Sequence, residues 1–269
     1  SIEDLFTTNI HRVTEAIRSL EESGKLLSLP SSKFQEIRFS LYEIEKQVMS
    51  EYCRKFKIAT MYDALYAILD SQFVLQNNYA AAAQELIAGG AKIIQLRMKY
   101  ANKGEILSVA HSLSALCEKN SVLFIVNDHV DIALLSNADG VHLGQHDIPI
   151  VEARRILPNH MIIGQSTHSL EELNRAFNEK PDYIAYGPLF DTHSKTGELL
   201  SGIGYKNLRV QELHISTPLV AIGGVGKKNI LELIKAGFTT FCCISELFAN
   251  DNITENCKTI VDIIDSKDI

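Results

Sequence analysis

The sequence has 269 residues, of which 46% are hydrophobic and 22% are charged, and its formal net charge is −7 at pH 7. This composition predicts a chain that buries a full core, either as one large domain or as a domain with an appendage, and it excludes wholesale disorder. The acidic balance and the lack of a basic block exclude nucleic acid and an anionic membrane as main partners, so any anion must be bound locally.

Residues 1–60 differ from the rest of the chain in their hydrophobic pattern. Apolar side chains recur there at helical spacing in two stretches, and Pro30 lies in the break between them. This pattern predicts a helical hairpin without catalytic residues, which either packs on the following domain or builds a homo-oligomer interface. The two apolar stripes are Ile10, Val13, Ile17 and Leu20, and Phe34, Ile37, Leu41, Ile44 and Val48.

From about residue 64, short apolar runs alternate with amphipathic helical segments. The runs are 65–69, 93–96, 123–126, 140–143, 162–164, 183–186, 219–222 and 240–244, and the helical segments include 79–88, 105–118, 169–178 and 228–236. Eight β-then-α units match the lower size limit of a (β/α)₈ TIM barrel, whereas an open doubly wound sheet normally needs fewer strands. We therefore predict an α/β chain with a TIM barrel over residues 64–269, preceded by the helical hairpin. Polar residues at the carboxyl ends of its strands become the candidate active-site residues.

The second predicted strand carries polar side chains in alternation. Gln95, Arg97 and Lys99 should share one face, and because helices cover the outside of a barrel, this face should point inward. Buried cations need an anion, and a diphosphate would supply one. The alternative is a structural salt bridge to Asp70 or Asp128.

Two acids follow successive strands. Asp128 comes after the third run and Asp147 after the fourth, so both should converge on one mouth of the barrel. Hard cations such as Mg²⁺ are often held by one or two carboxylates, with substrate phosphate completing the shell. The pair is therefore a candidate Mg²⁺ site, unless these acids only begin loops or cap helices.

The later strand ends carry weaker signals. Ser166 follows the fifth run, where it would donate to a phosphate oxygen or cap the next helix. Residues 190–197 form a polar segment, read either as a mobile loop over the mouth or as a solvated turn. Gly223 and Gly224 follow the seventh run and Ser245 follows the eighth, which is a place where such barrels often bind a phosphate monoester.

The cysteines and the hydropathy pattern bear on location. Five cysteines without metal-like spacing predict reduced thiols. No apolar run approaches the roughly 20 residues that span a bilayer, and the amino terminus lacks a secretion signal. We therefore expect a cytoplasmic protein.

The segment from Asn127-Asp128 to Gly140-Val141-His142-Leu143-Gly144-Gln145-x-Asp147 resembles the signature of thiamine phosphate synthase. The resemblance extends over about residues 64–248, and the amino-terminal hairpin resembles a helical extension of some family members. It implies an alkyl (non-methyl) transferase that uses Mg²⁺ and two small-molecule substrates. The enzyme would transfer the 4-amino-2-methylpyrimidinyl-methyl group from its diphosphate to thiazole phosphate, giving thiamine phosphate and diphosphate.

The resemblance also implies roles for individual residues. The catalytic residues would be Arg97, Lys99, Lys195 and Ser166. The pyrimidine diphosphate would be bound by Gln95, Leu96, Arg97, Met98, Lys99, Asn127, Ser166 and Lys195. The thiazole phosphate would be bound by Thr192, His193, Ser194, Gly224, Ile244 and Ser245. Asp128 and Asp147 would bind Mg²⁺.

Two other functions remain open at this point. A related thiazole tautomerase uses the same barrel, and His168 lies where that relative would use a histidine. The diphosphate-binding set distinguishes the two, because an isomerase has no use for it. The other alternative is a non-catalytic sensor of a phosphate ligand.

Overall fold

The computed structural model describes residues 2–74, 76, 78–194, 198–204 and 217–266. It divides into two compact units, residues 1–55 and residues 56–269. Among the described residues, no helix is long and apolar enough to cross a membrane.

The first unit is the predicted helical hairpin. It consists of α1 (Ile2–Leu26) and α2 (Ser32–Thr60), although the residues of α2 from Phe56 onward belong to the second unit. Glu21 is buried between the helices and accepts hydrogen bonds from Lys25 (2.6 Å) and Arg38 (3.3 Å).

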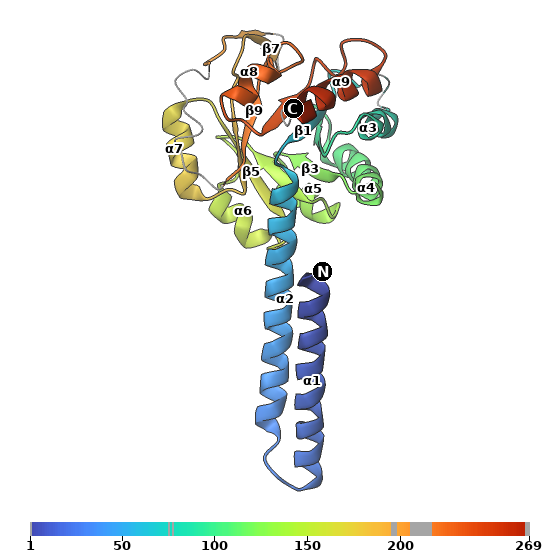
Figure 1. The fold of residues 1–269 in the computed structure, drawn as a ribbon, viewed down its shortest axis with the longest axis vertical. Helices are drawn as coiled ribbons and strands as arrows, with labels where there is room; N and C mark the ends of the chain where they lie inside the picture. The colour runs from blue at the N-terminus through green and yellow to red at the C-terminus, as the bar shows by residue number, and fades with distance from the viewer. Residues whose placement is uncertain (1, 75, 77, 195–197, 205–216, 267–269) are drawn as a thin grey trace. The chain divides into compact units, whose positions relative to one another are not determined.

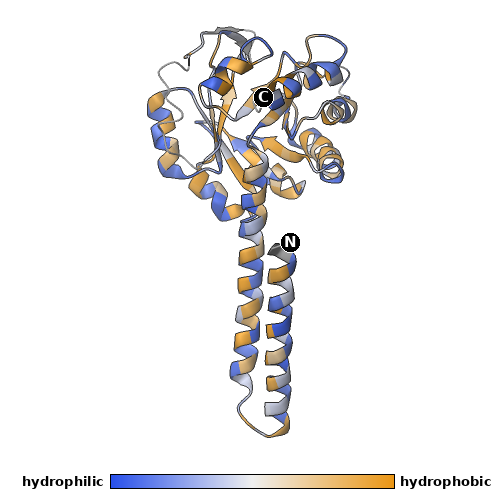
Figure 2. Cartoon of the chain, viewed as in Figure 1, coloured by the Kyte–Doolittle hydropathy of each residue, from blue (hydrophilic) through white to orange (hydrophobic). Residues whose placement is uncertain are grey.

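The apolar stripes of the hairpin are wider than the contact between its helices. Figure 2 shows hydrophobic residues along both helices. Several members of the predicted stripes are about half exposed, namely Val13, Leu20, Ile37, Ile44 and Val48. The helical periodicity is therefore confirmed, but one partner helix covers only part of it.

The second unit contains the predicted TIM barrel (Figure 1). Eight parallel strands close in the order β1-β2-β3-β4-β5-β6-β9-β10. They are β1 (Ala64–Asp70), β2 (Ile93–Arg97), β3 (Leu123–Asn127), β4 (Gly140–Leu143), β5 (Ile162–Thr167), β6 (Tyr183–Tyr186), β9 (Leu219–Ile222) and β10 (Thr240–Cys243). The helices of this unit are α3 (Tyr79–Ala88), α4 (Lys103–Lys119), α5 (Val130–Leu135), α6 (Ile150–Ile156), α7 (Leu170–Glu179), α8 (Ile230–Lys235) and α9 (Ile253–Asp265).

Two details of the predicted strands were wrong. β5 runs to Thr167, three residues beyond its predicted end at Gly164. The polar segment after β6 contains β7 (Thr192–Ser194), which pairs antiparallel with β8 (Glu198–Leu200) just beyond it, and neither short strand was predicted.

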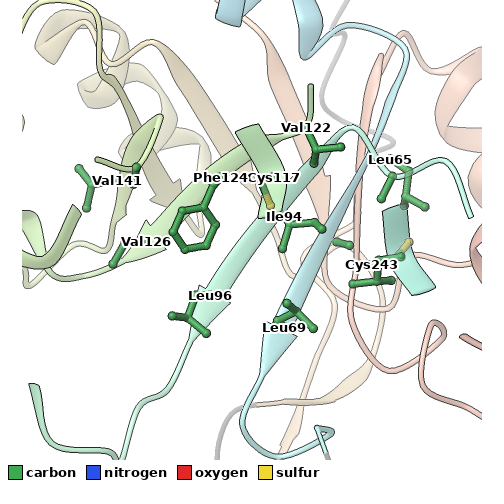
Figure 3. Packing of buried hydrophobic residues seen from close by; sticks show 14 of the residues in the cluster. Leu65, Leu69, Ile94, Leu96, Cys117, Val122, Phe124, Val126, Val141 and Cys243 are labelled. Atoms are coloured by element: carbon green, nitrogen blue, oxygen red, sulfur yellow. The ribbon is translucent and has the colours of Figure 1, made fainter. Parts of the chain in front are cut away.

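Alternation along the strands divides the core into two layers. The outer layer packs between the strands and the helices, and Figure 3 shows Ile94 and Leu96 of β2 within it, near Phe124 of β3. The inner layer fills the barrel and includes Tyr66 of β1 and Tyr183 of β6. Inward-facing polar residues are therefore found on the same strand faces as the inner layer.

The end of α2 and the turn after it pack against the amino-terminal ends of the barrel strands. Met61 is fully buried in the inner layer, and its carbonyl accepts a hydrogen bond from Thr240 Oγ1 at 2.7 Å. Lys57 forms an ion pair with Asp139 at 2.9 Å and donates to the carbonyl of His160. Residues 56–63 are thus part of the barrel unit.

Candidate active site

A cavity opens at the carboxyl ends of the barrel strands. Eight of the predicted site residues line it: Gln95, Arg97, Asn127, Ser166, Thr192, Gly224, Ile244 and Ser245. The barrel geometry thus brings together residues that lie up to 150 positions apart in the sequence.

Arg97 is buried at the end of β2 and forms an ion pair with Asp70, its register partner on β1. Asp70 is also buried, and its other oxygen accepts the N–H of Gln72 at 2.9 Å. The salt bridge that the sequence left open is therefore present. A guanidinium has five N–H donors, so one bond to Asp70 fixes its orientation and leaves other donors for an anion in the cavity.

The neighbours of Arg97 are placed differently from the prediction. Strand β2 ends at Arg97, so the predicted alternation does not extend to Lys99, which lies exposed in the following turn. Leu96 lies in the outer core, and Met98 packs against that core. The side chains of Leu96 and Met98 therefore point away from the cavity, and only their backbone remains available to a ligand.

Asp128 and Asp147 lie close enough to influence each other. Burial and the nearby carboxylate of Asp147 raise the pKa of Asp128 to about 6. Asp128 has a left-handed backbone (φ 63°) and donates its N–H to the carbonyl of His142 at 2.8 Å. Asp147 accepts the N–H of Gly144 at 2.6 Å. Neither carboxylate caps α5 or α6, so the helix-capping part of that alternative was wrong, whereas Asp128 does begin the loop after β3.

This acid pair fits a hard divalent cation. Two neighbouring carboxylates repel each other, and a cation bound between them would relieve that repulsion. Within the described ranges, no cluster of three or more His, Cys, Asp or Glu residues forms a closed metal cage. Two carboxylates that leave the other positions to water and substrate phosphate are the arrangement typical of Mg²⁺.

The loop after β9 forms the opposite wall of the cavity. Gly223 (φ 88°) and Gly224 (φ 67°) both adopt left-handed backbone, and a Cβ atom at Gly224 would lie 2.8 Å from the Cβ of Phe190. Asn229 donates to the carbonyl of Gly224 at 2.8 Å and holds the loop in place. Ser245 lines the same side of the cavity, so backbone and hydroxyl groups are available to a phosphate there.

The polar segment after β6 is described only in part. Thr192 lines the cavity, and the backbone of His193 and Ser194 completes β7. The side chains of His193 and Ser194, and the whole of Lys195, lie outside the described residues.

Ser166 lies on β5 and not in the loop after it. Its Oγ is 2.8 Å from Nε2 of His142, and the cap of α7 is Ser169 instead. The idea that Ser166 caps this helix was therefore wrong. Its place on the strand points its hydroxyl into the barrel.

Tyr66 and His142 line the cavity floor and Tyr183 is buried beside them, and none of the three was predicted as a site residue. The hydroxyls of Tyr66 and Tyr183 are 2.8 Å apart, and Nδ1 of His142 is 3.0 Å from the hydroxyl of Tyr183. Strand alternation was the available signal, because Tyr66 lies four residues before Asp70 on the same face of β1. His142 lies within the Gly140–Asp147 part of the motif, but the motif alone does not indicate a role for its side chain.

Comparison with known proteins identifies the family. Residues 65–247 match the family model described as thiamine monophosphate synthase. The chain belongs to this family. A thiamine-phosphate synthase of Halalkalibacterium halodurans is 40% identical over 205 residues, which are 76% of this chain and 97% of the relative. One from Thermosynechococcus vestitus is 37% identical over 250 residues, 91% of this chain and 68% of the relative.

Solved structures agree with this family assignment. The thiamine phosphate pyrophosphorylase of Pyrococcus furiosus superposes with a TM-score of 0.69 and is 32% identical, covering 77% of this chain and 98% of that structure. A 3-hexulose-6-phosphate synthase superposes with a TM-score of 0.51 at 15% identity, which shows the barrel fold alone. Residues 1–47 match a second model, that of the ThiD2 family. The resemblance drawn from the Asn127–Asp147 motif is confirmed.

In this member of the synthase family, His168 also lines the cavity. Its Nδ1 lies 2.6 Å from the carbonyl oxygen of Gly187, so Nδ1 carries the proton and donates it. In the neutral form of the ring, Nε2 is therefore the nitrogen without a proton. This histidine is the feature that the tautomerase alternative requires.

Proposed function

We propose that the chain is a thiamine phosphate synthase that carries out the alkyl transfer described above. One observation supports this proposal in addition to the family membership. A single cavity combines Arg97, beside the carboxylate pair, with the glycine loop and Ser245 on its other side. Two separate places for anions in one cavity suit a reaction between a diphosphate and a phosphate.

The side chains on the β2–β5 side would bind the pyrimidine diphosphate. Arg97 would donate to the diphosphate oxygens, while Gln95, Asn127 and Ser166 would contact the same substrate. We assign Lys99 and Lys195 to the diphosphate as well, by the family pattern. Mg²⁺ held by Asp128 and Asp147 would neutralise negative charge on the leaving diphosphate.

The chemical step breaks one bond and forms one. The C–O bond to the diphosphate breaks, and the diphosphate leaves with the electron pair, stabilised by the cations around it. The thiazole nitrogen then gives its lone pair to the pyrimidine methylene carbon, which forms the new C–N bond. No side-chain nucleophile is needed, since the cavity acts by charge stabilisation and by orientation.

The β9–β10 side would position the second substrate. The backbone around Gly224, with Ser245, Thr192 and Ile244, would hold the thiazole phosphate so that its nitrogen faces the methylene. We assign His193 and Ser194 to this substrate on the family pattern. The proposed location is the cytoplasm, in keeping with five free cysteine thiols.

The test is diphosphate release by the purified chain given both substrates, with Mg²⁺ and then with a chelator. We expect release that requires the thiazole phosphate and that stops with the chelator. Folded protein that binds thiazole phosphate but releases no diphosphate would contradict the proposal.

The tautomerase remains a second candidate because His168 lines the cavity and its Nδ1 donates to the carbonyl of Gly187, which leaves Nε2 as the ring nitrogen able to act as a base. His168→Gln keeps a polar side chain but removes the ring base. We expect this variant to retain at least half of the rate of diphosphate release. Loss of thiazole isomerisation in this variant, with no diphosphate release by the unaltered chain, would favour the tautomerase.

A further inference from the structure

Five side chains from five strands form one continuous hydrogen-bonded row across the cavity floor. Gln95 Nε2 is 2.7 Å from the hydroxyl of Tyr66, which is 2.8 Å from the hydroxyl of Tyr183. Tyr183 is 3.0 Å from Nδ1 of His142, and Nε2 of His142 is 2.8 Å from Oγ of Ser166. The first four of these side chains are buried, while Ser166 is half-buried at the cavity.

The chemistry of the first group sets the direction of the row. An amide nitrogen only donates, so the oxygen of Tyr66 accepts from Gln95. A phenol has one proton, and because Gln95 already donates to Tyr66, the acceptor in the row that remains for the Tyr66 proton is the oxygen of Tyr183. Tyr183 in turn donates to Nδ1 of His142. A neutral imidazole that accepts at Nδ1 carries its proton on Nε2 and donates it to Ser166.

We propose that this row orients its protons in one direction, so that Ser166 presents its O–H as a donor to an acceptor atom of the pyrimidine diphosphate. Tyr66, Tyr183 and His142 are then positioning residues that act through Ser166. The choice of ligand rests on the proposed function, but the direction of the row does not.

Packing holds the row in this arrangement. Gly164 lies between His142 and Tyr183 in the strand register, and a Cβ atom there would lie 2.0 Å from the ring of Tyr183. The missing side chain lets the Tyr183 ring lie across β5 and stack on His142, with ring centroids 5.5 Å apart. Burial also raises the pKa of both tyrosines, so their hydroxyls stay protonated.

The first test reads the tautomer of His142 by ¹⁵N NMR of the full chain, without substrates. The chain has nine histidines, so the His142 signals are assigned by their loss in His142→Gln or by their shift in Ser166→Ala. We expect a neutral ring with the proton on Nε2. A proton on Nδ1, or a doubly protonated ring at neutral pH, would overturn the proposal.

Two variants test the direction itself. Tyr183→Phe removes the donor to Nδ1, so the ring should become a mixture of tautomers, and kcat for diphosphate release should fall about fivefold. Gln95→Glu replaces the terminal donor with an acceptor, so the row should reverse and the proton should move to Nδ1. The control is Tyr186→Phe, on the same strand but in the outer core, and it should leave the His142 tautomer unchanged.

These readouts separate the two proposals. If His142 carries its proton on Nε2 but the chain releases no diphosphate, the proposed function is contradicted and the direction of the row still holds. Circular dichroism checks that Tyr183→Phe and Gln95→Glu are folded. If the His142 tautomer is unchanged in both folded variants, the inference is contradicted, whereas the proposed synthase activity is not.

Discussion

At the scale of the residue, the cavity depends on how its charges are held before any substrate arrives. Arg97 is buried, and Asp70 fixes its position from the neighbouring strand. A buried cation without an anion would be costly, so the carboxylate of Asp70 offsets the cost of burying Arg97. The same contact holds the guanidinium in place, which lowers the cost of ordering it when a diphosphate binds.

Arg97→Lys tests the need for the planar fork. Lysine keeps the charge but cannot bind Asp70 and a diphosphate in the same geometry, so we expect kcat/KM for the pyrimidine diphosphate to fall by about 100-fold. Asp70→Asn keeps Arg97 but weakens its anchor and should give a smaller loss. Steady-state kinetics measure both. Equal kcat/KM for Arg97→Lys and the unaltered chain would remove Arg97 from the diphosphate site.

Asp128→Asn tests the metal site. The change removes one of two neighbouring carboxylates, and we expect diphosphate release to fall by about 100-fold or more because the Mg²⁺ would lose a charged ligand. The melting temperature without Mg²⁺ should rise slightly, since the repulsion by Asp147 is gone. The control is Asp131→Asn, an exposed acid paired with Lys103, which should keep full activity. Full Mg²⁺-dependent activity of Asp128→Asn would exclude Asp128 as a ligand.

At the scale of the element, strand alternation explains what the sequence could and could not predict. The eight apolar runs were enough to predict the barrel, and the polar residues at strand ends predicted much of the cavity lining. The row across the floor was missed because its contacts join distant residues, such as Tyr66 and Tyr183, 117 positions apart. The predicted β5 was too short because Gln165 and Ser166 resemble loop residues. In the structure Gln165 donates to Glu179 of α7, and Ser166 contacts His142 of β4.

Gly164→Ala tests this packing. The added methyl group has no room beside the Tyr183 ring, so we expect the free energy of unfolding to fall by about 1–3 kcal/mol. Urea denaturation would measure it. Gly104→Ala is the control, because this glycine is exposed near the start of α4 and alanine there favours the helix. If Gly164→Ala unfolds at the same urea concentration as the unaltered chain, the close packing at Gly164 is contradicted.

At the scale of the whole molecule, the two units differ in what they contribute. The relative from Halalkalibacterium halodurans matches 205 residues, which are 76% of this chain and 97% of the relative. A family member can therefore be shorter than this chain. The division between the units lies within α2, because residues from Phe56 belong with the barrel. Whether a fragment without the first unit folds stably should therefore depend on the residue at which the fragment begins.

Two fragments test this boundary. Residues 56–269 keep the Lys57–Asp139 ion pair and the fully buried Met61, and we expect this fragment to fold and to release diphosphate at close to the full rate. Residues 64–269 lack both. Loss of a buried methionine side chain costs about 2–5 kcal/mol, and the partly exposed ion pair adds little, so this shorter fragment should melt at a clearly lower temperature. Calorimetry of the two fragments measures the difference, and equal melting temperatures would show that residues 56–63 do not stabilise the barrel.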